Sequence, residues 1–574
     1  MNQRIQLASL DDQRNVAARE AVRQRISWPA NLTPANVTYH SRGHVLLLGS
    51  AHTAYSAARL LQGRGLASLT LLLTDEPEQQ NALSGGSEPL IERRFSTEQL
   101  QQLHVSGHLG AFHVELRPVG GEVLNLAQAL IERSDFDVVL DMTGAECSIN
   151  TPPWELPPPG YVALDWATAS NPGEVLDSVA ELIGEFDKPR YFQVNSDLCA
   201  HSSSGNVGCT SCLDVCPADA ISSHKGRIES RIEIDPFLCQ GVGSCTSACP
   251  TGAIEFRLPE TRRQQDTLST WLTAYREAGG QVPVMRFITQ DALDAERQAG
   301  VVTPGFVLDA PLEELGAAGH DQWLTALANG AAEVRIHLHE AMPPRLSAFL
   351  TDQLTQAHSL LEALGHDAAR IQFIEPSDSD ARDALPALMP LTDAALALPE
   401  PDKRQRLNRV LEHLATLGTP SGERHPMLSG AAYGAIEVDI VACTLCYACV
   451  SNCPTPALSA GGDTPSLSFR EADCVQCGLC EKACPEDAIS LLPGFLAAPE
   501  RHVRHVCHEE APFECINCGK AFATASTVAT IKQKLAHHPY FAGEAMARLE
   551  MCEDCRVKDV WKTMIRDPDA QLKV

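Results

Sequence analysis

The chain has 574 residues, which is too long for one hydrophobic core and fits about three to five domains. Its 45 Lys and Arg against 73 Asp and Glu give a formal net charge of -28, which disfavours nucleic-acid binding. No stretch approaches the ~20 apolar residues of a membrane span, and the polar N-terminus lacks the apolar segment of a signal peptide. We therefore expect a cytoplasmic protein without membrane insertion.

Residues 1–185 alternate apolar strands with helices, an order that predicts a parallel sheet covered by helices, and hence a Rossmann-like α/β domain. The predicted strands are residues 44–49, 69–74, 112–117 and 137–141. A dinucleotide site would need GxGxxG after the first strand, but the sequence there is GSAHTA, although Asp75 stands where a ribose-binding acid would lie. We expect a structural or docking domain without flavin or NAD.

Cysteine is the most informative residue type. Twenty-one cysteines at short, regular spacing indicate metal ligation rather than a disulfide framework. Twenty of them lie in three patches, at residues 199–249, 443–484 and 507–555. Cys147 stands apart, and we expect it to be a small buried hydrophobe.

The first patch lies in a predicted domain of residues 186–260. It reads Cys199-x9-Cys209-x2-Cys212-x3-Cys216-Pro217, then Cys239-x5-Cys245-x3-Cys249-Pro250. The first run contains the insertion AHSSSGNVG, which is typical of a surface loop. In the second run, Val242 stands where the intact runs further along the chain have a second cysteine.

Residues 261–430 contain no cysteine and predict a second α/β domain, with strands at 282–288, 333–340 and 370–376 and long helices between them. His337 and His339 project from one strand face, which we interpret as an exposed face rather than a metal site. The stretch from NGAAEVRIHL to HDAARIQFIEPS resembles the delta-subunit family of methyl-viologen-reducing hydrogenases. That family's cysteines are absent here, so the resemblance implies only the fold and a docking role.

Residues 431–495 carry two intact cysteine runs. They read Cys443-x2-Cys446-x2-Cys449-x3-Cys453-Pro454 and Cys474-x2-Cys477-x2-Cys480-x3-Cys484-Pro485. Three thiolates on one tight loop face three irons of a cubane, and in two-cluster ferredoxins the fourth cysteine of each run serves the other cluster. We therefore predict two four-cysteine sets, one of Cys443, Cys446, Cys449 and Cys484, the other of Cys453, Cys474, Cys477 and Cys480.

The same exchange in the first patch leaves one set incomplete. It predicts a four-cysteine set of Cys199, Cys209, Cys212 and Cys249 and a three-cysteine set of Cys216, Cys239 and Cys245. Three thiolates suit a [3Fe-4S] cluster, or a [4Fe-4S] cluster whose fourth iron takes water or another side chain. The whole chain would then hold three [4Fe-4S] clusters and one cluster of this fourth kind.

Residues 500–574 contain two CxxC pairs, Cys515 with Cys518 and Cys552 with Cys555. Two such pairs typically build a tetrahedral thiolate site, so we predict a zinc-binding domain with one zinc ion. A further iron–sulfur cluster is the alternative. Cys507, His508, His537 and His538 are spare potential ligands.

The four runs with their Cys-Pro endings resemble the bacterial-type 2[4Fe-4S] ferredoxin family, across residues 190–257 and 432–492. This resemblance implies two α+β ferredoxin-like electron-transfer domains. The whole layout resembles the iron–sulfur cluster-binding proteins that accompany bacterial molybdenum formate dehydrogenases, through CAHSSSGNVGCTSCLDVCP, CQGVGSCTSACPTGAI and MCEDCRV. That second resemblance implies a redox-enzyme partner of the formate dehydrogenase type.

These features predict a polyferredoxin that passes electrons between redox enzymes and has no catalytic residues of its own. One alternative is a flavin- or NAD-linked redox enzyme subunit of the heterodisulfide-reductase type, which bound flavin would identify. A second alternative is an assembly factor for a molybdoenzyme. The donor, the acceptor, the direction of electron flow and the oligomeric state stay open.

Overall fold

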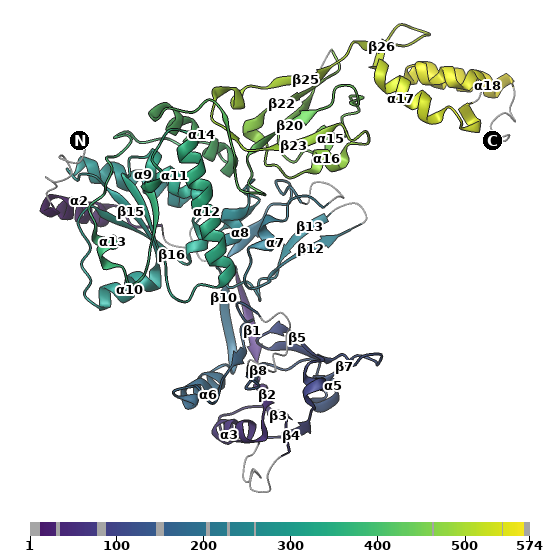
Figure 1. Ribbon diagram of the computed structural model, residues 1–574. Helices are drawn as coiled ribbons and strands as arrows, with labels where there is room; N and C mark the ends of the chain where they lie inside the picture. Colours follow the sequence, from purple (N-terminus) through teal and green to yellow (C-terminus); the bar gives the residue numbers. More distant parts are fainter. Residues whose placement is uncertain are drawn as a thin grey trace.

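The computed structural model describes residues 12–29, 35–76, 88–144, 154–201, 207–226, 230–257, 260–461, 464–541 and 543–566. Cys147 and most of the insertion after Cys199 lie outside these residues. Within the described part the protein is a mixed α/β chain of several units, arranged as in Figure 1. None of the described helices is long and apolar enough to cross a membrane.

The first sheet is parallel throughout, with the strand order β4-β3-β2-β8-β9. Its strands are β2 (His44–Gly49), β3 (Ser68–Leu73), β4 (Leu90–Arg94), β8 (Val138–Asp141) and β9 (Tyr161–Ala163). Helices α3 (Ala51–Leu61) and α6 (Pro172–Glu181) form a core with one face of this sheet. Strands β2 and β3 are buried along almost their whole length, as expected when both faces of a parallel sheet are covered.

The other face of this sheet is covered by a small antiparallel sheet. It consists of β5 (Leu103–His108), β6 (Ala111–Leu116) and β7 (Leu124–Asn125), next to α4 (Thr97–Leu100) and α5 (Leu126–Ile131). The segment 112–117, which we predicted as part of the parallel sheet, therefore lies in β6 of a different sheet. The reason is visible in its alternating burial, since Phe112 and Val114 are buried and their neighbours are half-buried, which is typical of an antiparallel strand.

A two-stranded antiparallel ribbon joins this part to the rest of the molecule. It consists of β1 (Asn36–Ser41) and β10 (Gly184–Pro189) and stands between the two bodies in Figure 1. Helix α2 (Asp12–Arg25) precedes the ribbon but packs on the central region, where Ala18 and Val22 join the largest core.

The cysteine runs of the first patch lie in a compact unit of short elements. Strand β11 (Phe192–Val194) pairs with β14 (Ile254–Phe256), β12 (Ile221–Lys225) pairs with β13 (Ser230–Ile234), and the helices are α7 (Ser211–Asp214) and α8 (Ser244–Ala248).

The second patch repeats this plan. Strand β20 (Gly434–Val438) pairs with β23 (Ile489–Pro493), β21 (Leu458–Ala460) pairs with β22 (Ser466–Phe469), and the helices are α15 (Ala448–Asn452) and α16 (Leu479–Ala483), with η5 (Glu471–Asp473) before Cys474. Strand β25 (His505–Glu509) adds to β22.

The central region is a parallel four-stranded sheet with helices around it, in the strand order β16-β15-β17-β18. The strands are β15 (Val284–Thr289), β16 (Val307–Leu312), β17 (Glu333–His337) and β18 (Ile371–Ile374). The helical elements are α9 (Thr261–Glu277), α10 (Gln290–Gln298), η3 (Leu315–Ala317), α11 (His320–Ala328), α12 (Pro344–Ala363), η4 (Ala368–Arg370), α13 (Ser379–Asp383) and α14 (Lys403–Leu417). The short pair β19 (Arg424–His425) and β24 (Phe495–Leu496), with η6 (Pro499–His502), ties this region to the second ferredoxin-like unit.

The last segment projects from one end of the molecule (Figure 1). It comprises the pair β26 (Pro512–Glu514) and β27 (Ala521–Thr524), followed by α17 (Ala525–Leu535), η7 (Pro539–Phe541), η8 (Gly543–Glu550) and α18 (Glu553–Arg566). The hydroxyls of Thr524 and Thr527, at the start of α17, both donate hydrogen bonds to the carbonyl of Thr444. The segment is thereby held next to the loop that carries Cys443 and Cys446.

Candidate functional site

Three of the four cysteine runs share one backbone turn. In each of these runs, the second and fourth residues after the first cysteine have a left-handed backbone conformation, with φ between 52° and 86°. These residues are Gly241 and Gly243, Leu445 and Tyr447, and Gln476 and Gly478. Such a conformation is costly for residues other than glycine, and turns of this kind point backbone N–H groups into an anion-binding concavity. Val242 therefore occupies the same place in its turn as Cys446 and Cys477 do in theirs.

Cys199, Cys209, Cys212 and Cys249 lie near one another in the structure. Burial raises the pKa of Cys212, and the neighbouring thiols of Cys249, Cys209 and Cys199 raise it further. His201, at the start of the insertion, is buried, and its ring bonds to the carbonyl of Cys209 at 2.9 Å and to the Ser223 hydroxyl at 2.7 Å. These contacts hold His201 against the backbone that carries Cys209.

The three-cysteine set contains two buried cysteines, Cys239 and Cys245. Burial raises the pKa of Cys245 well above its usual range, and the thiols of Cys239 and Cys216 add to the effect. Val242 packs against the central core. A Cβ on Gly243 would lie 2.6 Å from the backbone nitrogen of Ala317, so the turn rests directly on η3.

The third set lies nearest to solvent. Burial raises the pKa of Cys449 to about 12, with further contributions from the thiols of Cys446, Cys443 and Cys484. These four cysteines line one small cavity, and Cys446 is exposed. Cys507, on β25, packs with this group, and its pKa is raised to about 11 by burial and by the Cys443 thiol.

The fourth set has the same arrangement and lines its own small cavity. Burial raises the pKa of Cys480 to about 12, and the thiols of Cys474, Cys477 and Cys453 raise it further. Four thiols that raise one another's pKa require a compensating cation or cluster before all of them can be thiolates, so the residues of each set fit an iron–sulfur cluster.

The two cysteine-bearing units meet through their cluster turns, the backbone segments that carry Cys209 in the first unit and Cys477 in the second. Burial raises the pKa of Cys477 to about 11, and the thiol of Cys209 is among the neighbours that contribute. A Cβ on Gly208 would lie 3.0 Å from the Leu479 side chain, and Lys482 Nζ donates to the Val207 carbonyl at 2.8 Å. One cavity of about 390 Å³ is lined by Cys209 and Cys477 together.

Helix α14 fixes this junction from the side of the central region. Lys403 Nζ donates to the carbonyls of Thr246 (2.9 Å) and Ser247 (2.8 Å) in the first unit. The next residue, Arg404, donates to the carbonyls of Ala472 (2.9 Å) and Cys474 (2.7 Å) in the second unit. Two neighbouring residues on one helix thus hold both units in place.

The C-terminal cysteines form a fifth group. The sulfurs of Cys515, Cys518, Cys552 and Cys555 all lie within 4.8 Å of one another, with 3.6 Å between Cys518 Sγ and Cys552 Sγ. Burial opposes ionisation of Cys515, but the backbone N–H groups of Cys552, Asn517 and Cys518 hold its pKa down to about 6. Cys507 does not join this group, and His508 pairs with Glu510 at 3.2 Å.

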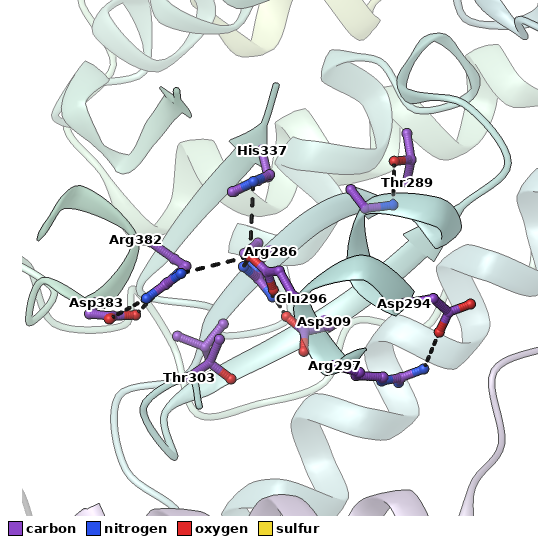
Figure 2. A network of polar contacts seen from close by, with 12 residues as sticks. Arg286, Thr289, Asp294, Glu296, Arg297, Thr303, Asp309, His337, Arg382 and Asp383 are labelled. Carbon is purple, nitrogen blue, oxygen red and sulfur yellow. Dashed lines mark hydrogen bonds and ion pairs between the residues drawn. The ribbon is translucent and has the colours of Figure 1, made fainter. Parts of the chain in front are cut away.

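A separate polar cluster lies on the central sheet (Figure 2). Arg286 is fully buried and forms ion pairs with Glu296 (2.8 Å) and Asp309 (2.7 Å). Our interpretation of His337 as an exposed residue is wrong, since it is buried with Nε2 at 3.9 Å from Glu296. Because the charges of this network compensate one another, we assign it a structural role in the central sheet.

The N-terminus of α3 is occupied by a side chain of the protein itself. The Asp75 carboxylate accepts a hydrogen bond from the backbone N–H of Ala51, and Ser50 caps Thr53 N–H at 3.2 Å. A carboxylate at this helix end takes the place where a dinucleotide fold binds pyrophosphate. Asp75 is thus a helix-capping residue.

Sequence reasoning missed the residues that contact the turns from elsewhere, among them Lys188, His201, Lys403 and Arg404. His201 lies in a stretch whose polar, small residues indicated only a loop. The other residues carry no local signal, because each belongs to an element distant in sequence from the carbonyl to which it donates.

Comparison with known proteins agrees with the site. Residues 207–253 and 442–489 each match a family described as a 4Fe-4S dicluster domain. The chain is also 36% identical over 61 residues to an uncharacterized ferredoxin of Methanocaldococcus jannaschii, a match that covers 97% of that protein and 10% of this chain. The chain therefore belongs to the ferredoxin family and binds 4Fe-4S clusters through two dicluster domains, in an electron-transfer role.

Proposed function

We propose that the protein is a polyferredoxin whose two dicluster domains form one continuous path for electrons. The observation that carries this proposal is the junction at which the Cys209 and Cys477 turns meet. The rate of electron transfer falls steeply as the distance between clusters grows. Two ferredoxin domains that served separate partners would therefore not need two adjacent cluster turns. Helix α14 holds this contact with Lys403 and Arg404.

The path runs through four cysteine sets. In order, they are Cys216, Cys239 and Cys245; then Cys199, Cys209, Cys212 and Cys249; then Cys453, Cys474, Cys477 and Cys480; then Cys443, Cys446, Cys449 and Cys484. The first set would hold a [3Fe-4S] cluster or an incompletely ligated [4Fe-4S] cluster, and the other three would each hold a [4Fe-4S] cluster. Such clusters supply one-electron redox chemistry when bound.

The test is metal analysis of anaerobically purified protein together with EPR spectroscopy of its oxidised and reduced forms. We expect about 15 or 16 iron atoms per chain with matching acid-labile sulfide and no flavin. Interacting signals in the reduced protein would support a connected path. About eight iron atoms, or stoichiometric flavin, would contradict it and favour a flavin-linked redox subunit.

We infer that the C-terminal group binds one zinc ion. Four sulfurs within 4.8 Å from two CxxC pairs match the tetrahedral thiolate sites in which zinc is structural. The low pKa of Cys515 favours the thiolate that a metal requires. Zinc analysis of the purified protein tests this inference, and iron in place of zinc would contradict it.

We propose a cytoplasmic redox enzyme of the formate dehydrogenase type as the partner. Support comes from the sequence resemblance and from the exposed Cys446 end of the path, where Ile440 and Val441 are 57% and 92% exposed. Reduction of the purified protein by formate in the presence of such an enzyme would support this partner. Absence of reduction, when a low-potential chemical donor reduces the same sample, would contradict it.

A further inference from the structure

Lys188 and Arg404 make matching contacts with two cluster turns. Lys188 Nζ donates to the carbonyls of Phe237 (2.7 Å) and Cys239 (2.9 Å). Arg404 donates to the carbonyl of Cys474 at 2.7 Å. Cys239 and Cys474 are each the first cysteine of the second run in their pair, so the two cations stand at equivalent places in the two dicluster domains.

Each cation also lies over a tyrosine ring. Lys188 Nζ is 4.9 Å from the ring centre of Tyr39, and Arg404 Cζ is 5.0 Å from that of Tyr433. Both cations come from outside the matched dicluster segments 207–253 and 442–489, Lys188 from the ribbon strand β10 and Arg404 from helix α14. The two neighbouring regions of the chain thus each deliver one positive charge to a cluster turn.

Neither cation is compensated by an ion pair within the described part of the chain. Burial lowers the pKa of Lys188 to about 8, and the groups that raise it are the Cys239 thiol and Asp235. Asp235 itself accepts hydrogen bonds from the backbone N–H groups of Phe237 and Leu238. A partly buried cation without an ion-pair partner is costly, and it becomes favourable when an anionic cluster lies beside it.

Two nearby cations provide the contrast. Arg345 donates to the carbonyl of Cys216, but it pairs with Glu155 at 3.1 Å and with Asp219 at 2.5 Å. Lys403 also donates to two carbonyls near the cysteines, but it lies 3.7 Å from Asp321. Arg345 and Lys403 therefore form ion pairs with carboxylates, whereas Lys188 and Arg404 form none in the described part of the chain.

We propose that Lys188 and Arg404 are counter-charges that raise the reduction potentials of the clusters held by the Cys239 set and the Cys474 set. This inference rests on the proposed function. Reduction adds one electron from the donor enzyme to a cluster, with no bond formed or broken, and a fixed positive charge nearby favours the reduced form. Along the path, the two clusters beside these cations would alternate with two clusters of lower potential.

The experiment is an EPR-monitored redox titration of the full chain. In Lys188→Gln we expect the midpoint potential of the cluster held by Cys216, Cys239 and Cys245 to fall by at least ~59 mV. For a one-electron couple, this shift corresponds to a tenfold change in the reduction equilibrium. Arg404→Gln is expected to shift one [4Fe-4S] signal in the same direction, while Lys188→Arg keeps the wild-type midpoint. The matched control is Arg345→Gln combined with Asp219→Asn, which removes a cation and its paired carboxylate beside Cys216 together, so that the net charge is unchanged and the midpoints should not move.

Unchanged midpoints in Lys188→Gln and Arg404→Gln at full iron content would overturn the proposal. If Lys188→Gln loses iron while Lys188→Arg retains it, the positive charge is needed to hold the anionic cluster, which supports the proposal. Loss of iron in both variants would reduce Lys188 to a structural hydrogen-bond donor and overturn its role as a counter-charge. The wild-type iron content, measured first, separates these outcomes from a failure of the proposed cluster number.

Discussion

Val242 and Cys446 occupy the same position in two cluster turns of the same backbone conformation. Each lies between two residues of positive φ, Gly241 and Gly243 around Val242, and Leu445 and Tyr447 around Cys446. The turn around Val242 has thus kept the shape that presents a second ligand, although valine has no ligand atom. A single substitution at either position should therefore change the number of thiolates in its set.

Val242→Cys should therefore complete the three-cysteine set. We expect the [3Fe-4S] signal to disappear from the EPR spectrum of the oxidised protein and the iron content to rise by about one atom if the wild-type cluster is [3Fe-4S]. Loss of the valine methyl groups from its contact with the central core should cost about 1 kcal/mol of stability.

The reverse substitution is the matched control. Cys446→Val should leave three thiolates in the third set and introduce a [3Fe-4S] signal there, or lower the iron content. If Val242→Cys leaves the EPR spectrum unchanged, Val242 does not occupy a ligand position.

The junction between the dicluster domains depends on the small size of Gly208. A Cβ at this residue would lie 2.2 Å from the carbonyl oxygen of Ala200 and 3.0 Å from Leu479 Cγ. Gly208→Ala should cost about 1–3 kcal/mol through overpacking and slow electron equilibration between the two domains, as measured by rapid-freeze EPR. Gly173→Ala, in helix α6, is the control, and equal rates in the two variants would argue against this junction as the route.

Removal of one C-terminal thiol should abolish the metal site without affecting the clusters. In Cys552→Ser we expect loss of about one zinc ion and faster hydrogen exchange in α17 and α18, because a structural zinc site contributes directly to folding. Cys507→Ser should keep the zinc, since Cys507 lies with the Cys443 group instead. Zinc retained at full occupancy in Cys552→Ser would contradict the assignment.

His320 should make the junction sensitive to acid. Its ring is buried, with Nδ1–H donating to Gln353 at 2.6 Å and Nε2 accepting from the Tyr433 hydroxyl at 2.7 Å. Burial lowers the pKa of His320 below its usual 6.5, so the unfolded chain binds a proton that the folded protein resists. The neutral His320 ring therefore contributes its full stabilisation above pH 6.5, the pKa of the imidazole in the unfolded chain. As the pH falls from about 6.5 toward the pKa of His320 in the folded protein, this contribution is lost at up to ~1.4 kcal/mol per pH unit.

Hydrogen exchange of α11 at pH 7.5 and 5.5, corrected for the intrinsic rate, measures this loss. Wild-type protein should lose protection at the lower pH, whereas His320→Asn should begin with less protection and lose little more. Equal losses in both proteins would show that other groups control the acid response.

The cysteine chemistry could be predicted from sequence because its signal is local. Three cysteines spaced by two residues lie on one turn whatever surrounds it, and Cys-Pro marks where each run ends. Three strands of the central sheet were also predictable, since β15, β17 and β18 are apolar segments with long helices between them, but the edge strand β16 was not predicted. The strand 112–117 was misplaced because its residues show that it is a strand but do not identify the strand with which it pairs.

What the tertiary structure decided is how these local sites meet. Cys209 and Cys477 are brought together, and Lys188 and Arg404 reach the carbonyls of Cys239 and Cys474 from other regions of the chain. Such contacts have no periodicity or spacing, because they arise when separate cores pack against one another. The sequence by itself determined that the chain binds iron–sulfur clusters, and the packing of its parts decided which cluster turns are neighbours and which of them have a cation beside them.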